Sequence, residues 1–362
     1  CSPTVTALPR AMRSRSCCSA EAGGPLSRSP PTLCNVKRLL VDGFGRVHRD
    51  LRISVTDRCN FRCSYCMPAE GLEWLPRDDL LTFEEIERVA SVLVKRHGID
   101  SIRLTGGEPT VRANLPELVG MLSALPVDLA LTTNGSTLRL LAGRLADAGL
   151  RRINVSLDSL RADRFAELTL RDELPKVLDG IDAAIEVGFD PVKVNVVVIR
   201  GVNDDEVVDF ARFGREKGVV VRFIEFMPLD ADEAWNEGSV FSQEEIVAAI
   251  DSVFPLDVVE RTSAPATRFR YSDGGGEIGV VASVTRKFCD SCDRVRLTAD
   301  GQFRNCLFAV DEFDLRATLR SGADDDELSN VFEGAVAAKW AGHGIGHVDF
   351  IRPARSMSQI GG

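Results

Sequence analysis

The sequence lacks any long apolar run, although 44% of its 362 residues are hydrophobic. No stretch approaches the ~20 residues that a membrane-spanning helix needs, so we expect no membrane association. The chain is also short of positive charge, with 44 lysines and arginines against 54 acidic residues and a formal net charge of −10. This excess of acid argues against a general nucleic-acid-binding protein. A local cluster of arginines can still bind an anionic small molecule inside an acidic protein.

The ten cysteines lack the even spread that a disulfide framework shows in a small secreted chain. Six of them fall in two tight clusters, and the other four are Cys1, Cys17, Cys18 and Cys34. Clustered cysteines in a longer chain favour metal ligation in a reducing compartment. We therefore predict a cytoplasmic protein.

Residues 1–38 are short of acid and show no hydrophobic period: Glu21 is their single acidic residue, and Ser, Pro, Arg and Ala dominate. This composition predicts a disordered N-terminal extension. An arginine- and serine-rich, acid-poor start is also typical of organelle transit peptides. No clear amphipathic helix is evident, however, and the chain has no initiator Met. We favour a variable tail, or a start set too far upstream, over a transit peptide.

From Leu51 onward, short apolar runs rich in β-branched residues alternate with helical segments, which predicts parallel βαβ units. The expected strands are 52–55, 101–104, 127–131, 153–157, 192–199 and 219–224. The expected helices are 115–125, 138–148, 174–187 and 204–217, and a capping box opens another at Thr82. Six units are too few for a closed eight-stranded barrel and suit an open, partial one. In such barrels the chemistry gathers at the C-terminal ends of the strands.

The length suffices for about two domains at ~150 residues each. We predict an α/β fold in which residues 39–240 form a partial (βα)6 TIM-type barrel and residues 241–362 form a smaller C-terminal region. After Phe241 the alternation weakens into a helix at 242–252, mixed short segments and glycines. We expect this region to cover the mouth of the barrel.

Cys59, Cys63 and Cys66 follow the pattern C-x-x-x-C-x-x-C directly after the first expected strand. Thiolates are the usual ligands of iron–sulfur clusters. Three of them leave one iron of a four-iron cluster without a protein ligand, and an open metal position is typical of a chemical rather than a structural site. The alternative is a structural zinc or iron–sulfur site whose fourth ligand lies elsewhere in the chain.

A second set, Cys289, Cys292 and Cys306, has the spacing C-x-x-C-x13-C with no fourth cysteine nearby. The alternative here is a structural zinc site completed by His343 or His347. A further motif, T-G-G-E-P at 105–109, follows the second expected strand. Its glycines let the backbone approach a ligand closely, and Glu108 offers an acceptor, although alone the motif is an ordinary βα turn.

The first cysteine motif, with G-G-E-P about 40 residues later, resembles the radical S-adenosylmethionine (SAM) enzymes. The resemblance implies a radical SAM barrel in which SAM chelates the open iron. It also implies that Tyr65 lies near the adenine and that the G-G-E-P stretch contacts the amino group of the methionine.

The two cysteine sets together resemble one branch more closely, the GTP 3′,8-cyclase family of molybdenum cofactor biosynthesis, over residues 40–362. The matching segments are 51–59, 103–109, 131–135, 154–158, 192–195, 226–228 and the final Gly361-Gly362. In this lyase reaction a SAM-derived 5′-deoxyadenosyl radical takes the ribose 3′ hydrogen of GTP. The carbon radical then attacks guanine C8 to give 3′,8-cyclo-7,8-dihydro-GTP.

Position by position, the resemblance implies the following site. Two [4Fe-4S] clusters are held by Cys59, Cys63 and Cys66 and by Cys289, Cys292 and Cys306. The SAM site is lined by Tyr65, Gly107, Ser156 and Met227. GTP is contacted by Arg52, Arg103, Thr132, Lys193, Arg294, Val295 and Arg296. Cations suit a triphosphate because a guanidinium pairs with phosphate oxygens in a bidentate way.

Three details of this site remain open at the level of the sequence. The choice of Thr132 over Thr133 depends on counting back from Ser156. Asp293 replaces the Asn most often found there in the family. Gly361 and Gly362 reach into the active site on the family resemblance, because only a backbone without side chains fits there; the alternative is a frayed tail.

The resemblance further implies GTP as substrate, an electron donor of the flavodoxin or ferredoxin type, and a homodimer. It implies transfer of the product to cyclic pyranopterin monophosphate synthase, and no nucleic-acid or membrane partner. Two other functions remain open. One is a radical SAM enzyme that uses the second cluster as an auxiliary electron carrier and acts on a peptide. Binding of GTP would distinguish the GTP cyclase from this enzyme. The other is a non-enzymatic iron–sulfur or zinc protein such as a redox sensor, which would not cleave SAM.

Overall fold

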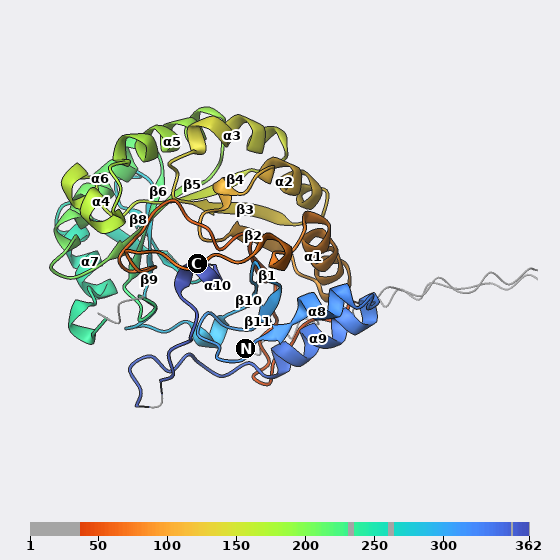
Figure 1. The fold of residues 1–362 in the computed structure, drawn as a ribbon. Coiled ribbons are helices and arrows are strands. Elements are labelled where there is room, and N and C mark those ends of the chain that lie inside the picture. Colours follow the sequence, from red (N-terminus) through yellow and green to blue (C-terminus); the bar gives the residue numbers. More distant parts are fainter. Residues whose placement is uncertain (1–36, 231–234, 260–263, 349, 362) are drawn as a thin grey trace, which may run out of the picture. The chain divides into compact units, whose positions relative to one another are not determined.

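The computed structural model describes residues 37–230, 235–259, 264–348 and 350–361. Strands and helices alternate from β1 to β6, as the sequence predicts (Figure 1). The strands are β1 (Asp50–Ser54), β2 (Ser101–Thr105), β3 (Asp128–Thr133), β4 (Arg152–Ser156), β5 (Val192–Val198), β6 (Val220–Glu225), β7 (Leu256–Val258), β8 (Thr267–Tyr271), β9 (Glu277–Val281), β10 (Arg294–Leu297), β11 (Gln302–Arg304) and β12 (Phe313–Asp314).

The helices include four that the sequence analysis did not predict, α4 and α8 to α10. They are α1 (Phe83–His97), α2 (Leu115–Ser123), α3 (Leu138–Asp147), α4 (Ala162–Thr169), α5 (Leu174–Glu186), α6 (Val207–Lys217), α7 (Gln243–Asp251), α8 (Leu315–Arg320), α9 (Asp325–Ala337) and α10 (Met357–Ile360). The expected helix 204–217 divides into a 3-10 turn, η3 (Asp204–Glu206), and α6. A signal for α9 was present, because Asp324 and Glu327 form a capping box at its start.

The described strands form one sheet in the order β12-β11-β10-β1-β2-β3-β4-β5-β6-β9-β8-β7. Strands β1 to β6 are parallel neighbours in chain order, which is the predicted partial barrel. Strand β10 pairs in parallel with β1, and β9 pairs in parallel with β6. Strands from the C-terminal region therefore extend both edges of the barrel sheet. The domain boundaries at 38/39 and 240/241 stay predictions.

Helices α1 to α6 lie outside the curved sheet, and an apolar core fills the space between (Figure 1). Strand β5 shows that each strand has one face toward this core and one toward the inside of the barrel. Val194 and Val196 are buried, while Lys193 and Asn195 are only partly buried. Successive residues of a strand point to opposite faces, so the second pair faces the inside of the barrel. Polar side chains at alternate positions thus reach the interior. None of the described helices combines the length and the apolar character that crossing a bilayer requires.

Candidate active site

One cavity inside the sheet brings together most of the residues that the sequence predicted for the site. Its lining includes Arg52, Cys59, Cys63, Tyr65, Cys66, Arg103, Gly107, Thr132, Ser156, Met227, Cys289, Cys292, Arg294, Arg296 and Cys306. Lys193 and Val295 are not in that lining. Val295 is fully buried in the apolar core, on the strand face opposite Arg294 and Arg296. The two cysteine sets, far apart in the sequence, therefore share one cavity.

The loop that carries the first cysteine set lies directly against the G-G-E-P turn. Gly107 N–H donates to the carbonyl of Thr56 at 2.7 Å, and Glu108 N–H donates to that of Arg58 at 2.7 Å. A Cβ on Gly107 would lie 2.4 Å from the carbonyl oxygen of Asp57. The glycine is needed here because the backbone of the cysteine loop approaches so closely.

Glu108 uses its carboxylate to join the ends of β2 and β3. Its Oε1 accepts from Thr110 Oγ1 at 2.5 Å and from Thr133 Oγ1 at 2.6 Å, while Oε2 accepts from Asn134 N–H at 2.6 Å. Burial raises the pKa of Glu108. From the sequence we expected Glu108 to offer a hydrogen-bond acceptor to a ligand. In the structure, both of its carboxylate oxygens also accept hydrogen bonds from the protein. Thr133 is engaged in the same network, whereas Thr132 instead accepts from the side chain of Asn154 at 3.1 Å.

Tyr65 is fixed by a hydrogen bond to the neighbouring strands. Its hydroxyl donates to Asp158 Oδ2 at 2.5 Å, and Asp158 Oδ1 accepts from Val197 N–H at 2.8 Å. Burial raises the pKa of Asp158 to about 6 and that of Tyr65 well above its usual range. The aromatic ring thus has a set position relative to β4 and β5, next to Cys66 in the cysteine loop.

The two cysteine sets differ in their electrostatic surroundings. Burial raises the pKa of Cys59 to about 11 and that of Cys66 to about 12. Burial would also raise the pKa of Cys292, but Arg294 and Lys339 outweigh it and lower that pKa to about 7. Arg294 Nη2 lies 3.5 Å and Lys339 Nζ 3.7 Å from the Cys292 sulfur. The second set therefore has a thiol that ionises near neutral pH, because two cations lie beside it.

Each cysteine set brings three thiols to one cavity, and thiolates are the ligands that iron–sulfur clusters take. Among the residues that the structure describes, no three His, Cys, Asp or Glu side chains converge as the ligands of one ion do. A four-iron cluster binds each thiolate at a different iron, so its ligands need not meet at one point. His343, a possible fourth zinc ligand, accepts from Ile345 N–H at Nδ1 (3.2 Å) and packs against Phe308.

Three arginines form a row across neighbouring strands, which we call the arginine row: Arg103 on β2, Arg52 on β1 and Arg296 on β10. Arg52 stands in register with Arg103 on one side and with Arg296 on the other. Burial, reinforced by Arg103, lowers the pKa of Arg52 to about 9. Among the described residues, the Nε atoms of Arg52 and Arg103 are buried without a hydrogen-bond partner. Like charges directly opposite destabilise a sheet, and the carboxylate of Asp50 offsets only part of this repulsion, since the pKa values of Arg52 and Arg103 are still lowered.

Arg222 on β6 extends this positive surface, and the sequence analysis missed it. It lines the cavity beside Asn195, its register partner on β5. Burial lowers the pKa of Arg222 to about 10. Burial and Arg222 together lower the pKa of Lys193 to about 8. A signal was present in the sequence, because Arg222 is a lone polar residue inside the apolar run 219–224.

The C-terminal segment also enters the barrel (Figure 1). The Gly361 carbonyl accepts a hydrogen bond from Arg296 Nη1, within the arginine row. Gly361 has φ +86°, and a Cβ there would lie 2.9 Å from Thr105 Cγ2 and 3.1 Å from Ser54 Cβ. Both the backbone conformation and the space require glycine. Gly362 lies outside the described residues.

Two family models match the chain: the Radical SAM superfamily over residues 53–214 and Molybdenum Cofactor Synthesis C over residues 219–345. The chain is 49% identical over 352 residues to GTP 3′,8-cyclase of Rhodopirellula baltica, which covers 95% of this chain and 96% of that protein. It is 49% identical over 329 residues to GTP 3′,8-cyclase of Streptomyces coelicolor, with 90% and 96% covered.

Solved structures show similarity in fold at low sequence identity. Streptococcus suis SuiB has a TM-score of 0.57 at 13% identity, with 83% of this chain and 69% of that chain covered. Methylornithine synthase (PylB) has a TM-score of 0.50 at 17% identity, with 79% and 86% covered. With the radical SAM match, these similarities confirm the predicted α/β partial barrel.

Proposed function

The chain belongs to the GTP 3′,8-cyclase family of radical SAM enzymes, and we propose that its arginine row holds the triphosphate of GTP during this reaction. The enzyme uses SAM and [4Fe-4S] clusters and acts in molybdenum cofactor biosynthesis. When bound, SAM and the first cluster would supply a 5′-deoxyadenosyl radical to take the ribose 3′ hydrogen of GTP. Closure of the substrate radical onto guanine C8, with uptake of one electron and one proton, would give 3′,8-cyclo-7,8-dihydro-GTP.

The observation that supports the triphosphate site best is the register of the arginine row. Three guanidiniums at neighbouring positions of a buried surface repel one another, and two of their Nε atoms lack partners. A triphosphate supplies several negative charges and many acceptor oxygens, so it relieves both the repulsion and the unmet hydrogen bonds. Because the cations are already in place, little reorganisation is needed when the anion binds. Lys193 and Arg222 add charge on the β5–β6 side.

The cysteines hold the clusters in this proposal, three to each. Cys59, Cys63 and Cys66 bind the first cluster and leave one iron for SAM. Cys289, Cys292 and Cys306 would hold the second, whose open iron would be available to a heteroatom of the guanine. The guanidinium of Arg294 contacts the Cys292 sulfur, so Arg294 connects the second cysteine set to β10, which carries Arg296 of the arginine row.

The remaining predicted residues take positioning roles. Tyr65, Gly107, Ser156 and Met227 line the SAM side of the cavity, and Thr132 is the threonine that contacts GTP. Val295 contributes through its backbone alone, because its side chain is in the core. Gly361 holds Arg296 in place through its carbonyl, and the catalytic role of Gly362 in this proposal rests on the family resemblance alone. The walls of the barrel keep water from the reacting carbon.

The partners follow from the chemistry of the family. Reductive cleavage of SAM needs an electron donor, which we propose is of the flavodoxin or ferredoxin type. The product passes to cyclic pyranopterin monophosphate synthase, and the enzyme acts as a homodimer. Because clustered thiolates favour a reducing compartment, we place the enzyme in the cytoplasm.

An anaerobic assay tests the function. The protein is reconstituted with iron and sulfide, then given dithionite, SAM and GTP, and the products are analysed by mass spectrometry. We expect 5′-deoxyadenosine together with an isomer of GTP of unchanged mass. If 5′-deoxyadenosine forms while GTP is untouched, the substrate is wrong and a peptide substrate becomes the better hypothesis. If loaded protein does not cleave SAM, the enzyme assignment fails.

Arg52→Gln tests the triphosphate site within the same assay. The substitution removes the central charge of the arginine row, and we expect the KM for GTP to rise at least about tenfold, as for loss of a charge-assisted pair. Arg215→Gln is the matched control, because Arg215 pairs with Asp273 on the outside of the barrel. An unchanged KM in Arg52→Gln would mean that GTP binds elsewhere.

A further inference from the structure

We propose that Arg355 is a positioning residue for the reaction: an ion-pair network around it fixes the C-terminal tail, residues 356–361, inside the active site. The inference rests on the proposed function, in which the tail lies beside the GTP site. The network consists of Arg355, Asp300, Glu312, Arg304 and Thr298, and we call it the Arg355 network.

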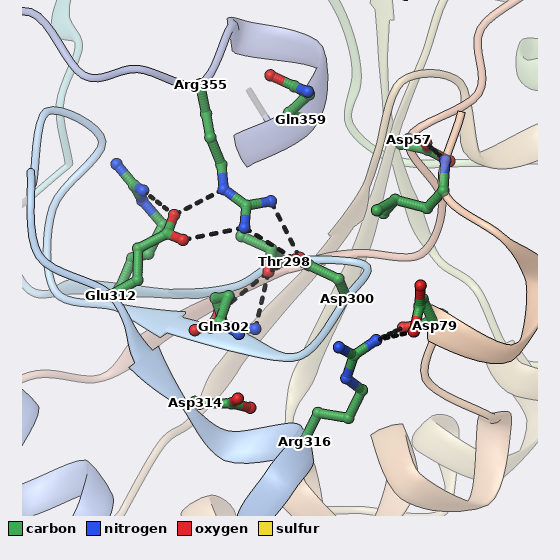
Figure 2. A network of polar contacts seen from close by, with 12 residues as sticks. Asp57, Asp79, Thr298, Asp300, Gln302, Glu312, Asp314, Arg316, Arg355 and Gln359 are labelled. Atoms are coloured by element: carbon green, nitrogen blue, oxygen red, sulfur yellow. Dashed lines mark hydrogen bonds and ion pairs between the residues drawn. The ribbon is translucent and has the colours of Figure 1, made fainter. Parts of the chain in front are cut away.

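The guanidinium of Arg355 lies between two carboxylates (Figure 2). Its Nη1 donates to Asp300 Oδ1 at 3.1 Å, and its Nη2 donates to Asp300 Oδ2 at 2.8 Å. Its Nε lies 2.8 Å from Glu312 Oε1, and Nη2 donates to Glu312 Oε2 at 2.9 Å. Each carboxylate is thus bound through both of its oxygens. Such forked pairs fix orientation as well as distance.

The two carboxylates are themselves held by the rigid part of the molecule. Asp300, in the turn between β10 and β11, accepts a hydrogen bond from Thr298 Oγ1 at 2.5 Å. Glu312 pairs with Arg304 of β11, which is almost fully buried. Burial would raise the pKa of Asp300, but Arg355 and Thr298 lower it, so the carboxylate is charged near neutral pH.

The network also reaches the loop of the second cysteine set. Arg304 Nη2 donates to the carbonyl of Ala309 and lies 3.5 Å from that of Leu307. Both carbonyls are within three residues of Cys306 in the chain. Arg355 therefore fixes the tail relative to the same frame that holds a proposed ligand of the second cluster.

The tail depends on an anchor at its base. Arg355 directly precedes Ser356, which caps the four-residue helix α10 through a capping box with Gln359. A single helical turn is marginal by itself in water. Within this helix, Met357 and Ser358 line the cavity. Directly after it, the Gly361 carbonyl accepts a hydrogen bond from Arg296. If Arg355 lets go of its carboxylates, the segment that follows can move, and six residues later it carries the Gly361 carbonyl that bonds to Arg296 of the arginine row.

The network is placed to position the tail rather than to stabilise the whole fold. Arg355 and Glu312 each have a side chain about a quarter exposed, at 23%. Water therefore reaches this end of the network and screens the carboxylates when Arg355 is replaced, whereas Arg304 at the other end is almost fully buried. Ile360 is buried and the Gly361 carbonyl bonds to Arg296, but residues 356–361 form no strand, whereas β10 and β11 are held in the sheet. We therefore expect loss of the network to free the tail and to leave the barrel folded.

Arg355→Gln tests this inference by hydrogen exchange of the tail and by GTP kinetics. We expect the amides of Ile360 and Gly361 to exchange at least about fivefold faster, because local opening becomes easier. The KM for GTP should rise by a similar factor, since Arg296 loses its carbonyl partner. The iron content and the melting temperature should match those of the wild-type protein.

Arg316→Gln is the matched control. Arg316 pairs with Asp79 at 2.8 Å in the same region (Figure 2), but the pair joins α8 to the turn at 77–79, and among the described residues neither side chain bonds to the tail. This variant should leave tail exchange and the KM unchanged. Wild-type tail exchange and a wild-type KM in Arg355→Gln would overturn the proposal, and so would equal effects of the two substitutions.

Arg355→Lys decides the matter if Arg355→Gln fails to fold. Lysine keeps the charge but cannot bind two carboxylates through paired hydrogen bonds. The exchange rate of the tail and the KM for GTP should therefore lie between those of the wild type and those of Arg355→Gln. A lysine variant that equals wild type in both readouts would contradict the role of the forked geometry. If the wild-type protein does not cyclise GTP, the proposed function fails, while tail exchange still reports on the network.

Discussion

Replacing Gly361 by alanine should expel the tail from the active site and stop GTP cyclisation while the barrel stays folded. Gly361 has φ +86° and ψ 102°, a region that residues with a Cβ rarely adopt. Holding alanine there costs about 1–3 kcal/mol. The new Cβ would also lie 2.9 Å from Thr105 Cγ2 and 3.1 Å from Ser54 Cβ, and overpacking of this kind costs about 1–3 kcal/mol.

The two costs act on the same short segment, so they add to at least about 2 kcal/mol against the docked tail. Since about 1.4 kcal/mol corresponds to a factor of ten, the equilibrium constant for docking of the tail should fall at least about 30-fold. The cost is local because the tail can leave without unfolding the sheet. Initial rates of GTP cyclisation, hydrogen exchange of residues 356–361 and the melting temperature measure these three consequences separately.

Gly120→Ala is the control for this substitution. Gly120 lies inside α2 with no atom within 4 Å of an added Cβ. There alanine should stabilise the protein by about 0.5–1 kcal/mol. Wild-type cyclisation and wild-type tail exchange in Gly361→Ala would refute the reasoning. A drop of many degrees in its melting temperature would refute the view that the cost is local.

Three further predictions concern the cofactor and substrate sites. Gly107→Ala places a Cβ 2.4 Å from the Asp57 carbonyl oxygen, so the cysteine loop must shift and about half of the bound iron should be lost; full iron by chemical analysis and spectroscopy would contradict this. Lys193, whose pKa is lowered to about 8, is charged below that pH and neutral above it, so kcat/KM for GTP should fall above about pH 8, and Lys193→Arg should flatten the profile. Iron binding releases protons from thiols, so the affinity for iron rises with pH at a site whose thiols are still protonated. Since the pKa of Cys66 is about 12 and that of Cys292 about 7, the affinity should rise more at the first site than at the second between pH 7 and 9. Chelator competition on Cys292→Ala and Cys66→Ala proteins, each with one site left, measures the two slopes, and equal slopes would contradict the prediction.

The sequence predicted those features that are local in the chain. The strand–helix alternation predicted β1 to β6 because each βα unit has its own apolar pattern. The cysteine spacing picked out two sets that line one cavity, because each set lies within one loop or hairpin, and Gly106, Gly107 and Glu108 of the T-G-G-E-P motif line it too; that these residues bind clusters and SAM stays a prediction. The close contact of Gly107 with the backbone at Asp57 is a tertiary fact that no spacing reveals.

The features that could not be predicted depend on pairing between distant segments. The pairing of β10 with β1 brings Arg296 beside Arg52, and only the register makes a row of them. In the same way, the sequence does not show that Glu108 accepts hydrogen bonds from Thr133 and Asn134, because these residues follow a different strand. Arg222 was overlooked for a different reason, since its inward position follows from the strand period and could have been inferred.

The parallel pairing of β10 with β1 has a consequence for biosynthesis of the protein. Arg52 and Arg296 are register partners about 240 residues apart, so half of the proposed triphosphate site is synthesised long before the other half. Contacts of such sequence separation form late in folding. A nascent chain that has released β1 to β6 already carries the first cysteine set but leaves the edge of β1 unpaired, and unpaired edges invite aggregation. The last quarter of the chain thus covers this edge of the sheet and completes the proposed triphosphate site, so we expect a product truncated before β10 to keep the first cysteine set without a complete place for the nucleotide.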